Sequence, residues 1–194
     1  MKPIFLIAFF CILSCKSQSP IVGLDARMYN TPDGAYYKDL NNELDKFVGT
    51  WKFTGNNSEF NMVLGKIEQM EIMNDYRDYL KGEYSYIENG SELVNTLPLN
   101  LSSNDNNVGG SYIIDDNNFL SCDDCSPNER RIKLFFKDPE RDYLNLNMVI
   151  RYMVGSSPEQ IQVIIYSRHG GIVPSENSPT TPRVPLGSYL MTKQ

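Results

Sequence analysis

The sequence is short of the side chains from which catalytic and metal sites are built. Its 194 residues include one histidine, His169, and four cysteines. A zinc site built on a Cys-x-x-Cys pair needs a second pair or more histidines, which the chain lacks. The sequence also contains no Gly-x-Ser-x-Gly turn for a serine nucleophile and no Asp-x-Asn-x-Asp-Gly loop for calcium. We therefore expect no catalytic residue, no metal and no cofactor.

Positive charge is scarce as well. The formal net charge is −6, and the basic residues are scattered along the chain rather than clustered. Because an acidic surface repels phosphate backbones, we expect no nucleic-acid partner. We expect a monomer.

No apolar run in the first part of the chain is long enough to cross a membrane. Ile4–Leu13 follows Lys2 and is shorter than the roughly 20 residues that span a bilayer, which is typical of a signal-peptide core. The run ends in Ile12-Leu13-Ser14-Cys15, which resembles the bacterial lipobox, where the cysteine is acylated and the chain is cleaved before it. The alternative is cleavage near Ser17-Gln18-Ser19, which would leave a soluble periplasmic protein.

The lipobox predicts a location and an anchor. Residues 1–14 would be removed and lipid attached at Cys15, since two acyl chains already hold a protein stably on a membrane. We expect a lipid-anchored protein of the bacterial cell envelope, on the outer membrane and facing the periplasm or the surface.

Two cysteines remain for the folded part, Cys122 and Cys125. In an oxidising compartment we expect them to form a disulfide. A redox dithiol and half of a zinc site are the alternatives. Asp123 and Asp124 lie between the cysteines and would raise the pKa of both thiols, which opposes thiol exchange.

Hydrophobic periodicity predicts one domain over residues 37–194, preceded by a polar, lipidated tether over 15–36. Leu40, Leu44 and Phe47 recur at the spacing of one helix face, so we predict a short helix over Tyr37–Val48. Beyond Gly49 the period falls to 2, which is typical of half-buried strands. The predicted strands number about nine: 50–54, 59–70, 80–88, 92–96, 112–114, 131–136, 143–153, 161–165 and 189–193.

The predicted fold is all-β. Consecutive strands joined by short turns, such as Asn89-Gly90, form an antiparallel meander, which hides its edges by closing into a barrel. Gly49-Thr50-Trp51 resembles the Gly-x-Trp signature of lipocalin-like (calycin) barrels, in which a short helix closes the barrel floor. The resemblance implies that fold.

A longer resemblance covers most of the chain. The string from Leu40 to Trp51, the start Cys15-Lys16-x-Gln18 and the ending 190–194 are similar to a family of small, uncharacterised bacterial lipoproteins. This resemblance implies a lipocalin-like domain of unknown function and transfers no site residues.

The most favoured function is a non-enzymatic binding module for a small apolar ligand or an envelope partner. Inward aromatic residues are the candidate ligand contacts, namely Trp51, Tyr84, Tyr86 and Tyr152. Because the inward side chains are large, we expect a mostly packed interior with a small apolar pocket at the open end. The loops 97–110 and 170–187 are long enough to be functional surfaces.

Two other functions stay open. One is an envelope hydrolase that uses His169 or the acidic loops Asp115-Asp116 and Asp123-Asp124. The other is a purely structural lipoprotein.

The lipobox generates the first prediction. We expect Cys15→Ala to abolish incorporation of radiolabelled palmitate and to release the protein from membranes, because the acyl chains are the only anchor proposed. Membrane retention of an unlabelled Cys15→Ala protein would contradict it.

Overall fold

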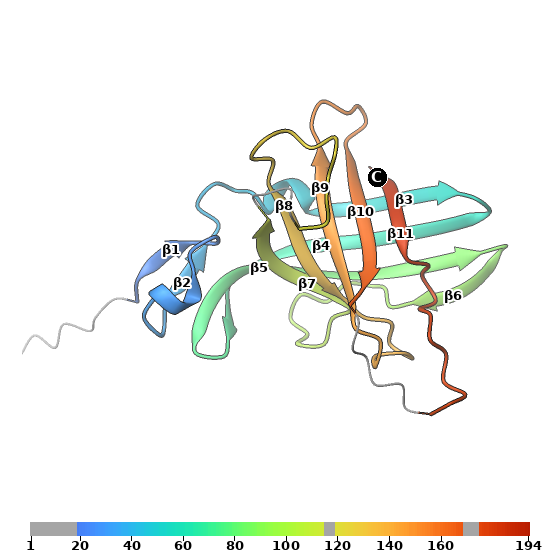
Figure 1. Ribbon diagram of the computed structural model, residues 1–194, viewed down its shortest axis with the longest axis horizontal. Helices are drawn as coiled ribbons and strands as arrows, with labels where there is room; N and C mark the ends of the chain where they lie inside the picture. The colour runs from blue at the N-terminus through green and yellow to red at the C-terminus, as the bar shows by residue number, and fades with distance from the viewer. Residues whose placement is uncertain (1–18, 115–118, 169–174) are drawn as a thin grey trace, which may run out of the picture.

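The structure, a computed structural model, describes residues 19–114, 119–168 and 175–194. These ranges form eleven strands and two single-turn 3-10 helices, η1 (Met28–Asn30) and η2 (Asp45–Phe47) (Figure 1). The strands are β1 (Ile21–Gly23), β2 (Tyr36–Lys38), β3 (Gly49–Gly55), β4 (Ser58–Ile72), β5 (Asp75–Glu88), β6 (Ser91–Asn95), β7 (Val108–Ile114), β8 (Arg131–Phe136), β9 (Leu146–Met153), β10 (Gln160–Ser167) and β11 (Gly187–Lys193). None of the described helices is long and apolar enough to cross a membrane.

Eight strands close into an antiparallel barrel, which confirms the predicted fold class. Around the barrel the order is β3, β4, β5, β7, β8, β9, β10 and β11, so it is a meander interrupted only by β6. Two short joints complete the ring. Thr192 and Lys193 of β11 pair with β3, and Leu80, Lys81 and Gly82 of β5 pair with β7.

The long strand β5 divides its pairing between two neighbours. Its last residues form a hairpin with β6 across Asn89-Gly90, whose φ angles of 49° and 78° confirm the predicted turn. Its middle pairs with β7. Near its start, Tyr76 and Arg77 pair in parallel with β2. In Figure 1 the β3–β4 and β5–β6 hairpins therefore project beyond the barrel on one side.

The helix expected over 37–48 is wrong except for the single turn η2. The buried carboxylate of Asp39 accepts hydrogen bonds from the backbone N–H groups of Glu43 (2.8 Å) and Leu44 (2.9 Å). Asn42 has a φ of 54°, a left-handed conformation that ends a right-handed helix. Leu44 and Phe47 are fully buried, so their spacing indicated burial correctly but not an α-helix.

The segment expected to be a free tether is folded from Ile21 onward. We call residues 21–38, with β1, η1 and β2, the flap. β1 pairs in parallel with β2, which extends the sheet from β5. Asp78, 1% exposed, accepts hydrogen bonds from the Tyr36 hydroxyl and the Asp39 N–H, which fastens the flap to the barrel. All described strands lie between Ile21 and Lys193, so a chain that starts at Ser19 contains the whole described fold.

Side chains fill the interior of the barrel. Phe60 packs edge-to-face against Tyr84, Tyr86 and Tyr189, with ring centroids 5.9, 6.2 and 5.2 Å apart. Further interior side chains that are at most 1% exposed come from all around the ring: Trp51, Met62, Leu80, Val108, Ile132, Leu134, Phe136, Met148, Ile150, Ile161, Val163, Ile165 and Met191. An eight-stranded barrel is just narrow enough for side chains to fill it in this way.

Glycines in the β5–β7 joint permit the close approach of neighbouring strands. At Gly82 on β5 a Cβ atom would lie 2.5 Å from Leu64 Cδ2 and 2.9 Å from the Val63 carbonyl oxygen, both on β4, and 3.2 Å from Val108 Cβ on β7. Gly110 has a φ of +148°, and its Cβ would lie 2.8 Å from the Lys133 carbonyl oxygen. The joint therefore excludes side chains at both positions.

A pair of substitutions tests this joint. Gly187 has nearly the same φ as Gly110, +147°, but open space around it. We expect Gly187→Ala to cost the strain of its backbone conformation alone, about 1–3 kcal/mol. Gly110→Ala should lower the free energy of unfolding by about 1–3 kcal/mol more, the usual cost of overpacking. Urea unfolding measures both, and equal losses would show that the joint tolerates a side chain.

Candidate functional site

The four aromatic residues proposed as ligand contacts belong to the filled interior or its edge. Trp51 and Tyr84 are 0% exposed and already have partners, since Trp51 Nε1 donates to the Phe47 carbonyl and the Tyr84 hydroxyl donates to the Lys137 carbonyl, both at 2.7 Å. Tyr86 is 2% exposed, and the half-buried Tyr152 donates its hydroxyl to Glu159. None of the four lines either of the pockets described below.

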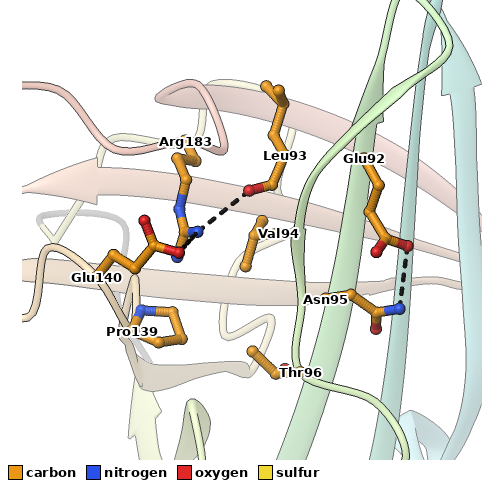
Figure 2. A pocket seen from close by; sticks show the side chains of 8 residues that line it. All are labelled: Glu92, Leu93, Val94, Asn95, Thr96, Pro139, Glu140 and Arg183. Atoms are coloured by element: carbon orange, nitrogen blue, oxygen red, sulfur yellow. Dashed lines mark hydrogen bonds and ion pairs between the residues drawn. The ribbon is translucent and has the colours of Figure 1, made fainter.

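One of these pockets lies at the end of the barrel near the 170–187 loop, where an apolar pocket was expected (Figure 2). It encloses about 240 Å³ between β6, the turn after β8 and Arg183. Its wall is largely polar. The Arg183 guanidinium donates to Asp138, to Glu140 at 2.7 Å and to the Leu93 carbonyl at 3.1 Å. Since these bonds already occupy its donors, Arg183 fastens this end of the barrel and presents little to a ligand.

The described part of the 170–187 loop, residues 175–186, is held against the same end. The hydroxyls of Tyr143 and Tyr189 donate to the carbonyls of Pro179 (2.9 Å) and Pro185 (2.6 Å). Val184 is 1% exposed and joins the core. The second half of this segment is therefore fastened to the barrel, although most of its residues are exposed.

Cys122 and Cys125 form the predicted disulfide, with an S–S distance of 2.02 Å. The bridge lies in a segment that is held to β9 by Arg151. That guanidinium donates to Glu129 and, at 2.8 Å, to Asp124. Its hydrogen bond lowers the pKa of the Glu129 carboxyl below the ordinary value. Asp124 therefore serves an ion pair, which argues for a structural role of the bridge and its acidic neighbours.

A larger groove, of about 690 Å³, runs along the outside of the barrel. The flap and the tip of the β4–β5 hairpin form one side of it, and the outer faces of β5, β7 and β8 form the other. In Figure 1 the flap and this hairpin tip both lie to the left of the barrel strands. The groove has a largely apolar wall, to which these side chains contribute: Leu24, Met28, Ile72, Met73, Tyr112 and Phe135.

Gly109 shapes the floor of the groove. A Cβ atom there would lie 2.9 Å from the ring of Tyr79 and 3.0 Å from the ring of Phe135. Because Gly109 has no side chain, the rings of Tyr79 on β5 and Phe135 on β8 can both lie close to β7. The groove thus depends on the same strand joint that closes the barrel.

Three cations line the groove, and none of them forms an ion pair within the described residues: Arg27, whose Nη1 donates to the Tyr29 hydroxyl, Arg77 and Lys133. Arg77 stacks its guanidinium on the ring of Tyr37, 4.5 Å from the centroid, and Lys133 places its ammonium 5.4 Å from the centroid of Phe119. Neither makes a hydrogen bond or ion pair with any residue in the described ranges. Burial lowers the pKa of the Arg77 guanidinium, and burial and the charge of Arg168 lower the pKa of Lys133. Both cations are therefore only partly hydrated.

Two hydroxyl groups add donors to the same groove. Ser111 is 2% exposed, and its buried hydroxyl has no hydrogen-bond partner in the described part of the chain. Burial raises the pKa of Tyr79 to about 12, so its phenol keeps its proton at neutral pH. Each group can donate one hydrogen bond.

The acidic residues of the groove are already engaged. Asp75 accepts the backbone N–H groups of Gly34 and Ala35, at 2.9 and 3.2 Å, and Asp25 forms an ion pair with Arg130 at 3.2 Å. Asp75 keeps its charge, which acts on Arg77. The three cations that line the groove, Arg27, Arg77 and Lys133, still outnumber the two carboxylates, so the groove carries an excess of positive charge although the whole protein is acidic.

Within the described residues, no three or more His, Cys, Asp or Glu side chains gather where they could hold a metal ion. Cys15, His169 and Asp115-Asp116 lie outside those residues. Their predicted roles stay predictions.

Comparison with known proteins gives one match. The profile described as "Family of unknown function (DUF6705)" matches residues 1–194. The chain belongs to this family. No curated protein and no solved structure matches it. Membership in DUF6705 confirms the expected family of unknown function and, like the resemblance, assigns no site residue, so the site has to be argued from the groove itself.

Proposed function

We propose that this DUF6705 member is a lipid-anchored, non-enzymatic binding module of the bacterial envelope, whose small ligand lies in the outer groove. One observation carries the binding role. The interior is packed, whereas the outer groove combines a largely apolar wall with donors that lack partners among the described residues. Its volume of about 690 Å³ is in the range of small-molecule sites.

The envelope location and the anchor rest on the sequence. The string Ile12-Leu13-Ser14-Cys15 supports lipid attachment, and a disulfide between Cys122 and Cys125 suits an oxidising compartment. The proposed partners are therefore the membrane, through the lipid on Cys15, and a small ligand or an envelope protein. A net charge of −6 argues against nucleic acid.

A titration of the 19–194 chain tests the binding role. The probes share an eight-carbon tail and differ in head group: octanoate, octyl phosphate, octanol and octyltrimethylammonium. We expect at least one to bind with 1:1 stoichiometry in isothermal titration calorimetry. Tyr112→Ser should weaken that binding by about fivefold, roughly 1 kcal/mol, because it removes an apolar part of the groove wall.

Leu190→Ser is the matched control. Tyr112 and Leu190 are both exposed apolar residues on strands, at 62% and 48%, but Leu190 does not line the groove. Its substitution should leave binding unchanged. The groove is not the site if both variants bind alike, and the binding role fails if no probe binds at all.

A further inference from the structure

We infer that the groove selects an organic anion, a carboxylate or phosphate attached to an apolar body, which Arg77 and Lys133 hold. The inference rests on the proposed function and names the chemical class of its ligand. The tail would lie along the apolar wall formed by Met28, Ile72 and Met73.

The first support is the state of the two cations. Burial removes part of the hydration of a cation. Where no carboxylate pairs with the cation, no ion pair offsets this loss. Arg77 and Lys133 share this condition, since each contacts an aromatic ring and neither forms an ion pair within the described residues, although the charge of Asp75 acts on Arg77 from a greater distance. The largely buried Arg183 and Arg151 are paired with Asp138 and Glu129, whereas Lys38 and Lys46, which lie outside the groove, have ring contacts alone within the described residues. An anionic ligand would supply the missing counter-charge.

The second support is independent of charge. A buried hydroxyl without a partner is unfavourable, because the desolvation of the group is not offset by a hydrogen bond, so native proteins rarely contain one. Ser111 lines the groove in that state, 2% exposed. An oxygen of a bound carboxylate or phosphate is an acceptor for this hydroxyl, and the phenol of Tyr79 offers a second donor.

The carboxylates at the groove would attract a cationic ligand if they were free, but both already have partners. Asp75 is held by two backbone N–H groups of the flap, and Asp25 by Arg130. Arg27, whose Nη1 donates to the Tyr29 hydroxyl, is a third cation along the groove. The balance of available charge is positive.

The same four probes test the inference on the 19–194 chain. We expect octanoate and octyl phosphate to bind at least about tenfold more tightly than octanol, since hydrogen bonds to charged groups are the strong ones. Octyltrimethylammonium should bind more weakly than octanol. The tighter of the two anions identifies the head group.

Variants locate the preference. Arg77→Met and Lys133→Met keep the apolar stem and should each reduce octanoate affinity by about tenfold, while octanol affinity changes less than about twofold. Arg77→Lys keeps the charge and should retain part of the preference. Lys52→Met is the control, because it removes the same charge from an exposed pair with Glu59 that is outside the groove. Ser111→Ala should weaken octanoate binding without lowering the melting temperature.

The outcomes separate the inference from the proposed function. Equal affinities for octanoate and octanol, both sensitive to Tyr112→Ser, would overturn the anion preference and leave the groove as a binding site. Tightest binding of octyltrimethylammonium would overturn it too. If none of the four probes binds, the inference and the proposed function both fail. Cooperative melting of each variant excludes misfolding as the cause of a loss.

Discussion

Three residue pairs between β5 and β7 close this barrel: Leu80 with Gly110, Lys81 with Gly109, and Gly82 with Val108. The joint is short because β5 pairs with β6 along its last part and with β2 near its start. The three glycines let the strands approach where a Cβ atom would meet backbone atoms or packed side chains. Closure removes the sheet edges, and the large inward side chains fill the interior. The binding site that we propose therefore lies on the outside.

The outer groove follows from the same joint. With Gly109 in the joint, the rings of Tyr79 and Phe135 both lie close to β7, and the flap and the tip of the β4–β5 hairpin form the opposite side of the groove. Two contacts hold the flap in place. The buried carboxylate of Asp78 accepts hydrogen bonds from the Tyr36 hydroxyl and from the N–H of Asp39, which directly follows the flap, and β2 pairs with β5. One side of the groove is thus built by the flap and the extended β4–β5 hairpin, which lie outside the barrel itself, and the other side by the outer faces of β5, β7 and β8.

Sequence patterns could predict the barrel because several of its strands, such as β4, β8 and β10, alternate between buried and more exposed residues, which leaves a period of 2 that can be read locally. The turn at Asn89-Gly90 was equally local. The helix over 37–48 failed because Leu44 and Phe47 are buried by a 3-10 turn that Asp39 caps, and their spacing fits both structures. The flap was missed because its two strands have three residues each, too few to show a period. β1 pairs in parallel with β2, and β2 pairs in parallel with β5, which lies far along the chain.

The candidate site was beyond sequence reasoning for a related reason. Arg77 and Lys133 occupy outward positions on strands, where an isolated cation usually indicates a solvated face. The flap and the hairpin tip lie over those faces, where both cations are partly buried and form no ion pair with any described residue. The aromatic residues that the pattern offered instead, Trp51 and Tyr84, are core residues with satisfied hydrogen bonds.

The most direct test of this account is whether a ligand binds in the outer groove or inside the barrel. Methionine side chains report on both places. Met28 and Met73 line the groove and are 61% and 89% exposed, whereas Met62 and Met148 are 0% exposed in the interior. In a ¹³C-methyl-methionine NMR titration of the 19–194 chain with octanoate, the account predicts saturable shifts of the Met28 and Met73 signals and none for Met62 and Met148. Shifts confined to Met62 and Met148 would contradict it, since they would place the ligand inside the barrel.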